Sequence, residues 1–185
     1  MSRHLQWRGC WQAPAASWET LALGDGHADS QLRVAATDGQ PPYQMDYRLA
    51  WDADWRLREA ELWVDGGHLQ RHLHLLADGQ GHWRLGDGSA LAELDGCLDI
   101  DIWPTPFTNS LPIRRLRLAA GESAALTVVY LEAPLLRPRP MRQGYACLDA
   151  RHYHYRNLEG SDFQAVLAVD ESGLVLDYPG LFERL

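Results

Sequence analysis

The chain has 185 residues, 46% of them hydrophobic and 23% charged, which fits one globular domain over residues 1–185 rather than a disordered chain or a membrane span. Its net charge of −8 disfavours nucleic acid as a partner, because phosphate contacts need a basic surface. All 17 basic residues are arginine, so mechanisms that need a Schiff-base lysine or a phosphate-loop lysine are excluded.

The first residues after Met1 are polar where an exported protein carries the apolar part of its signal peptide, so we expect a cytoplasmic protein. Cys10, Cys97 and Cys147 are odd in number and lack a metal-binding or redox spacing, which argues against a disulfide framework. The segment 121–125 only half matches a nucleophile elbow, and 79–81 does not match a dinucleotide fingerprint. We therefore expect no cofactor, no metal and no catalytic residue.

Short β-like runs separated by turn residues are the pattern expected of an all-β domain. They cover 44–51, 57–64 and 68–75, followed by a short run around Trp83 and another at 97–102. An Asp-Gly pair follows the second run and supplies the positive backbone angles of a tight hairpin. The sequence therefore predicts antiparallel strands here.

Three histidines fall on one face of the predicted strand 68–75, at His68, His72 and His74. Neighbours at alternate positions would suit a metal, but the first and last would be about 20 Å apart at a rise of about 3.3 Å per residue. No single ion could bind all three. We interpret them, and likewise His152 and His154, as polar stripes.

The segment 99–116 combines a strand, three prolines and an arginine doublet. Asp99 and Asp101 alternate along the strand and share one face. They could perform acid–base work, bind a cation or hold an arginine, and buried pairing with arginine is the simplest account. A helix at 110–116, capped by Asn109 or Ser110, is predicted, although a strand from residue 113 fits almost as well.

Basic residues gather at 113–142, where six arginines and two acids give a net charge of +4 against −8 for the whole chain. Arginine binds phosphate and carboxylate through its planar fork, so Arg114 and Arg115 could hold an anionic headgroup. The alternative is that these arginines pair with the surplus acids elsewhere on the surface.

Further strands are predicted at 124–131, 143–148, 151–157, 163–169 and 174–178, the last two joined by a turn at 170–173. The proline-rich stretch 134–140 is expected to be an extended or looped connection, because proline cannot donate to a ladder. Helical periodicity is scarce throughout. The residues thus predict a mainly β, antiparallel domain with one helix.

Eight tryptophans and seven tyrosines are many for this length. Tryptophan suits sugar stacking and the boundary between an acyl chain and its headgroup, although most of the eight are expected to pack across strands. Trp103, in the proline segment, and Trp83, between turns, are the better ligand candidates.

The chain resembles the bacterial putative glycolipid-binding family in motifs that lie beyond about residue 96. These motifs are Asp99-Ile-Asp101, Thr105-Pro-Phe-Thr-Asn109, Leu111-Pro-Ile-Arg-Arg-Leu116 and Leu174-Val-Leu-Asp-Tyr-Pro-Gly-Leu-Phe182. The resemblance implies a spiral β-roll, in which a many-stranded antiparallel sheet curls around a single helix, and a homodimer. It also implies a lipid or glycolipid ligand.

The residue patterns and the resemblance together give one candidate ligand-binding set. It consists of Asp99, Asp101, Trp103, Thr105, Asn109, Arg114, Arg115 and Tyr178. The first interpretation is a non-catalytic protein that binds a lipid or glycolipid. The second is a dimeric interaction scaffold without a small ligand, and the third is an enzyme that uses Asp99 and Asp101.

Overall fold

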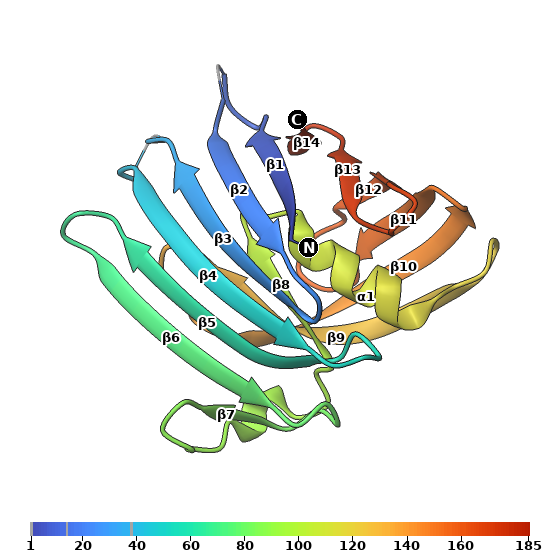
Figure 1. Ribbon diagram of the computed structural model, residues 1–185, viewed down its shortest axis with the longest axis horizontal. Coiled ribbons are helices and arrows are strands. Elements are labelled where there is room, and N and C mark those ends of the chain that lie inside the picture. The colour runs from blue at the N-terminus through green and yellow to red at the C-terminus, as the bar shows by residue number, and fades with distance from the viewer. Residues whose placement is uncertain (1, 14, 38) are drawn as a thin grey trace.

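A computed structural model describes residues 2–13, 15–37 and 39–185 of the chain. Its strands form one sheet of 14, in the order β7-β6-β5-β4-β3-β2-β1-β14-β13-β12-β11-β10-β9-β8. The sheet is curved, and α1 lies in its hollow (Figure 1). The strands are β1 (Arg3–Gly9), β2 (Ser17–Leu23), β3 (His27–Val34), β4 (Tyr43–Trp51), β5 (Leu57–Asp65), β6 (Gln70–Ala77), β7 (Trp83–Leu85), β8 (Asp99–Trp103), β9 (Ser123–Glu132), β10 (Arg139–Asp149), β11 (His152–Asn157), β12 (Gln164–Val169), β13 (Val175–Tyr178) and β14 (Phe182–Arg184).

The ten predicted strands all exist, with ends that shift by a few residues. The sequence interpretation missed β1, β2 and β3, and it also missed the short β14. The three N-terminal strands alternate between buried and exposed positions as strands should, but some of their inward positions are polar. Ser17, Glu19 and Ser30 are all buried. In β2 and β3 these polar residues hide the hydrophobic alternation on which the sequence interpretation depended, whereas the buried positions of β1 are Leu5, Trp7 and Gly9.

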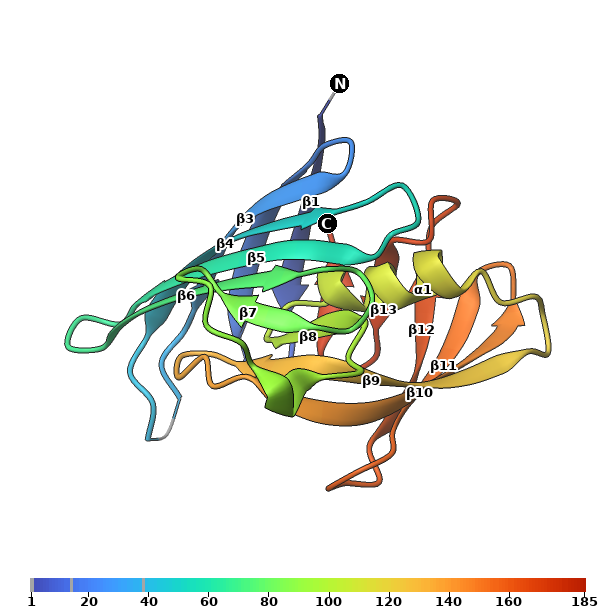
Figure 2. The same cartoon turned by 90° about the horizontal axis from the view of Figure 1, so that it is seen from below.

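Both ends of the sheet share one core. Ile100 and Ile102 of β8 and Val129 of β9 belong to the same buried cluster as residues of β4 and β5, such as Leu62. In Figure 2, α1 and β8 lie between the β4–β6 part of the sheet and the β9–β10 part. Strand β8 pairs with β9 in parallel, whereas its neighbours along the chain form antiparallel ladders. The Ile100 and Ile102 face of β8 is therefore buried in this core, whereas Asp101 and Trp103 are only partly buried.

The helix α1 (Ser110–Leu116) is confirmed at its predicted position. The 3₁₀ turn η2 (Phe107–Asn109) runs directly into it, and the Asn109 side chain makes no capping hydrogen bond, so the predicted cap is wrong. The Ser110 hydroxyl instead accepts a hydrogen bond of 3.2 Å from the amide of Val175. This bond fixes the start of α1 to β13, inside the curved sheet.

The proline-rich connection is shorter than predicted, because Pro140 lies within β10 and opposite Val129 of β9. Strand β11 pairs with β10 only from Gln143 onward, so Pro140 occupies a free edge where its missing amide hydrogen costs no ladder bond. The other described helical segment is the 3₁₀ turn η1 (Ala92–Leu94). No helix among the described residues is long and apolar enough to cross a membrane.

Candidate functional site

The segment that follows β8 is held by two threonine hydroxyls. The Thr105 oxygen accepts a hydrogen bond of 3.2 Å from the amide of Phe107. The Thr108 oxygen accepts one of 3.2 Å from the amide of Ile102. Short polar side chains thus satisfy backbone groups around the prolines. The turn holds Trp103 at the edge of a hollow.

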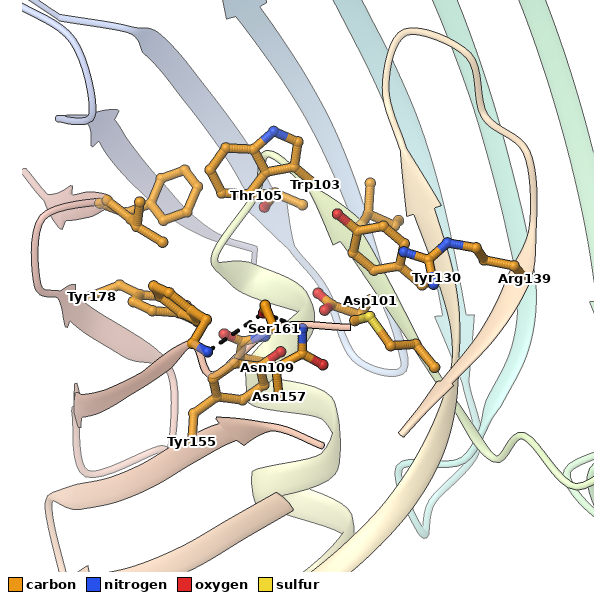
Figure 3. A pocket seen from close by; sticks show the side chains of 15 residues that line it. Asp101, Trp103, Thr105, Asn109, Tyr130, Arg139, Tyr155, Asn157, Ser161 and Tyr178 are labelled. Atoms are coloured by element: carbon orange, nitrogen blue, oxygen red, sulfur yellow. Dashed lines mark hydrogen bonds between the residues drawn. The ribbon is translucent and has the colours of Figure 1, made fainter. Parts of the chain in front are cut away.

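That hollow is a pocket of about 320 Å³, here called the aromatic pocket. Six aromatic side chains line it, contributed by β8, β9, β11, β13, β14 and the loop before β12. They are Trp103, Tyr130, Tyr155, Phe163, Tyr178 and Phe182. In Figure 3, Tyr155 and Tyr178 lie on one side and Tyr130 and Arg139 on the other, with Asp101 between them.

Tyr178 is the centre of the aromatic wall. Its ring centroid lies 6.1 Å from that of Tyr155, 6.1 Å from that of Phe163 and 6.0 Å from that of Phe182. Trp103 extends the wall, with its centroid 5.7 Å from that of Phe182. Most of these pairs are edge-to-face or tilted, the arrangement that aromatic quadrupoles favour. The wall is therefore a packed, preformed surface.

Asp101 is the carboxylate of the aromatic pocket. One oxygen accepts a hydrogen bond of 3.2 Å from the Thr108 hydroxyl, and the other accepts one of 2.6 Å from the Gln143 amide nitrogen. Burial raises the pKa of Asp101, and these two hydrogen bonds only partly oppose that rise. Within the described part of the chain, Asp101 forms no ion pair.

Unpartnered polar atoms surround Asp101. Asn109 and Asn157 both line the aromatic pocket, and the side-chain oxygen of each is buried without a hydrogen-bond partner among the described residues. The side-chain oxygen of Gln143 and the Tyr145 hydroxyl are in the same state. Unpaired buried oxygens of this kind cost free energy unless a donor reaches them. The Asn109 and Asn157 oxygens are thus acceptors in the pocket that a ligand donor could reach.

Asp99 lies outside the aromatic pocket. Arg115 donates two hydrogen bonds to its carboxylate, 3.0 Å from Nε and 2.6 Å from a terminal nitrogen. The carboxylate of Asp99 is only 1% exposed, so the pair links β8 to α1. Burial raises the pKa of Asp99 while Arg115 lowers it. The prediction of buried pairing with arginine is confirmed for Asp99, and neither residue of the pair is free to bind a ligand.

Arg114 points away from its neighbour Arg115. Its guanidinium carbon lies 4.2 Å from the centroid of the Trp55 ring, and it donates a hydrogen bond to the backbone oxygen of Ser172. Trp55 in turn stacks on Trp51 at 4.9 Å. Arg114 therefore connects α1 to the β4–β5 loop and the β12–β13 hairpin, away from the aromatic pocket.

The six arginines of 113–142 do not converge on one site. Arg139 lines the aromatic pocket and lies over the Tyr130 ring at 4.6 Å. Among the described residues, Arg115 is the one of the six that forms an ion pair. The expectation that these arginines pair with surplus acids is therefore wrong for the other five.

Trp83 is a core residue rather than a ligand candidate. It is 1% exposed, and its indole nitrogen donates a hydrogen bond of 2.8 Å to the carbonyl of Cys97. His72 and His74 bond to carboxylates of β5, Glu61 at 3.0 Å and Glu59 at 2.8 Å, as a polar stripe does. No group of three or more potential metal ligands was found in the part of the chain that the structure describes.

Five of the eight predicted site residues line the aromatic pocket: Asp101, Trp103, Thr105, Asn109 and Tyr178. Asp99, Arg114 and Arg115 do not. The sequence interpretation missed Tyr130, Tyr155, Asn157, Phe163 and Phe182. Phe182 belongs to the closing motif and could have been included. Tyr130 lies opposite Asp101 in the β8–β9 ladder, a pairing that the sequence does not reveal. Tyr155, Asn157 and Phe163 carry no local signal, because the curvature of the sheet brings them to the pocket.

Comparison with known proteins gives one consistent result. A model of a family described as putative glycolipid-binding matches residues 5–184. The crystal structure of a DUF1089 family protein from Pseudomonas aeruginosa is 62% identical, covers 95% of each chain and superposes with a TM-score of 0.90. No curated protein matches the chain.

Proposed function

Because the chain belongs to the putative glycolipid-binding family, we propose that it binds a lipid or glycolipid and holds the polar headgroup in the aromatic pocket. The observation that carries this proposal is the aromatic wall around unpartnered acceptors. Aromatic faces stack on sugar rings, and hydroxyl groups donate hydrogen bonds that Asn109 and Asn157 lack.

The size of the aromatic pocket supports binding of a headgroup rather than of a whole lipid. Its volume of about 320 Å³ lies at the lower end of the range for small-ligand pockets. Phe163 lines the pocket and is 40% exposed, so it offers an apolar surface at the rim. We propose that an acyl chain leaves the pocket along Phe163 while the headgroup stays inside.

An anionic headgroup bound by the arginine doublet has no support, since Arg114 and Arg115 are both engaged elsewhere. The proposal of an enzyme is weakened for the same reason, because the Asp99 carboxylate is occupied by Arg115. Asp101 is the carboxylate of the two that stays without an ion pair among the residues that the structure describes, and we propose that it binds a ligand rather than catalysing a reaction.

Three further features are part of the proposal. The shared core of the two sheet ends supports the spiral β-roll that the resemblance implies. A homodimer, which the resemblance implies, and a cytoplasmic location are further parts of the proposal. A dimeric scaffold without a small ligand is the competing function, and it has no use for the unpartnered acceptors of the aromatic pocket.

Native mass spectrometry tests the proposal, with solvent extraction of molecules that accompany the purified protein. Ser161 lines the aromatic pocket and is exposed, so Ser161→Trp should fill the pocket without disturbing the core. Ser89→Trp, in an exposed turn beyond β7, is the matched control. We expect an acyl-containing ligand on the wild type and on Ser89→Trp but not on Ser161→Trp. A protein that carries no ligand, and whose mass does not change after incubation with host lipid extract, would favour the scaffold function.

A further inference from the structure

The aromatic pocket contains a carboxylate that no cation balances. Asp101 has Thr108 and Gln143 as hydrogen-bond partners, both neutral. Asp99, its neighbour on the same face of β8, forms an ion pair with Arg115. The basic side chain that lines the pocket, Arg139, lies over the Tyr130 ring, and it forms no ion pair with Asp101 in the described part of the chain.

We propose that the headgroup bound in the aromatic pocket carries a protonated amine, and that Asp101 is its counter-ion. This inference rests on the proposed function and names the chemical class of the headgroup. An amino sugar has both properties that the pocket requires, since its ring stacks on aromatic faces and its ammonium group supplies the positive charge that Asp101 lacks as a partner.

Carboxylate and aromatic faces attract a cation together. An ionised carboxylate has about four lone-pair positions, and the hydrogen bonds from Thr108 and Gln143 use two of them. An ammonium group has three donors and no acceptor. It therefore matches a site whose unpartnered groups include the oxygens of Asn109 and Asn157. The π faces of the aromatic wall add a cation–π attraction.

Arg139 also lines the pocket, where its guanidinium lies over the Tyr130 ring, and Asp101 is the acidic side chain among the lining residues. Four tyrosines surround Asp101, from β9, β10, β11 and β13: Tyr130, Tyr145, Tyr155 and Tyr178. Burial raises the pKa of each one, that of Tyr130 to about 12, so all four are neutral at neutral pH. Asp99 is paired with Arg115. A bound ammonium would stabilise the Asp101 carboxylate, whose pKa burial raises. An anionic headgroup would instead be repelled by it.

The test compares three soluble probes that differ at one position: octyl β-glucoside, its 2-amino analogue and the N-acetyl form of that amine. Their dissociation constants are measured by calorimetry at neutral pH, below the micelle concentration. We expect the amine to bind at least about ten-fold more tightly than the N-acetyl probe, a difference of about 1.4 kcal/mol. Asp101→Asn should abolish that preference. Glu132→Gln, which removes the same charge at an exposed position of β9, should keep it.

The amine-to-acetyl ratio on the wild-type protein does not depend on any variant, so it remains decisive if Asp101→Asn fails to fold. Equal affinities for these two probes would overturn the amine inference. If the two probes bound equally well to the wild type and both bound more weakly to Trp103→Ala, the proposed function would stand and the amine inference alone would fail. Absence of binding by all three probes would overturn both proposals.

Discussion

Arg115 of α1 holds the Asp99 carboxylate of β8 through two hydrogen bonds, of 3.0 Å and 2.6 Å. Two residues further along β8, Asp101 has no such partner and faces the aromatic pocket. The two aspartates of one motif therefore differ in role. Asp99 fixes the helix inside the curved sheet, and Asp101 remains available to a ligand.

Replacing Asp99 should destabilise the protein strongly. Asp99→Asn leaves the Arg115 guanidinium, whose side chain is 14% exposed, without its counter-charge, which costs about 3–5 kcal/mol when a buried pair loses one member. Asp29→Asn is the control, because it removes the exposed pair with Arg48, for which we expect less than about 1 kcal/mol. Urea unfolding measures both changes. Equal losses for the two variants would show that the Asp99 pair has no structural role.

Two tryptophans should separate stability from binding. Trp83→Ala empties a fully buried position and should cost about 3–5 kcal/mol. Trp103 is partly exposed at the pocket, so Trp103→Ala should cost less stability and should weaken binding of octyl β-glucoside. Unfolding and titration are run on both variants. Tight binding by Trp103→Ala would place the headgroup elsewhere.

Glu19 should make stability depend on pH. It is 3% exposed and accepts hydrogen bonds from Ser30, Tyr47 and Thr105. Burial raises its pKa above the ordinary value of 4.5, so the folded state holds the proton more tightly than the unfolded state does. Stability should therefore be greatest below pH 4.5, as far as this group is concerned, and should fall as pH rises through the folded-state pKa.

Glu19→Gln should lack that part of the pH dependence, because the amide cannot ionise. The comparison is made by urea unfolding across a pH series, with Glu93→Gln at an exposed site as the control. Asp99 and Asp101, whose pKa values are also raised by burial, are the same in all three proteins. If the unfolding free energies of the wild type and Glu19→Gln changed with pH in parallel, ionisation of the buried Glu19 carboxyl would be ruled out as a cause.

Arg114 should matter for stability and not for binding. Its contact with the Trp55 ring is worth about 0.5–2 kcal/mol by the usual range of cation–π pairs. Arg114→Ala should lower the unfolding free energy by an amount of this order and leave the dissociation constant of octyl β-glucoside unchanged. A large loss of affinity in a folded Arg114→Ala protein would revive the arginine doublet as a ligand site.

The strand pattern from residue 43 to residue 178 and the helix at 110–116 could be predicted because turn residues and hydrophobic alternation are local properties. Strands β2 and β3 could not, since Ser17, Glu19 and Ser30 place polar groups on the buried face. The site was predicted where it lies on β8 and the turn after it. Tyr130 lies beside Asp101 through the parallel pairing of β8 with β9, and Tyr155 and Phe163 come to the same pocket through the bending of the sheet. Neither relationship leaves a mark in a short sequence window.

The most direct test of the account is a two-dimensional nuclear magnetic resonance titration that follows the indole N–H signals of the eight tryptophans. Octyl β-glucoside is added below its micelle concentration, and single Trp→Phe variants assign the signals. A headgroup in the aromatic pocket should shift Trp103 and its neighbour Trp11, whose ring centroid lies 5.0 Å from that of Trp103, while Trp83 stays in place. Shifts confined to Trp51 and Trp55, or no shift at all, would contradict binding in this pocket.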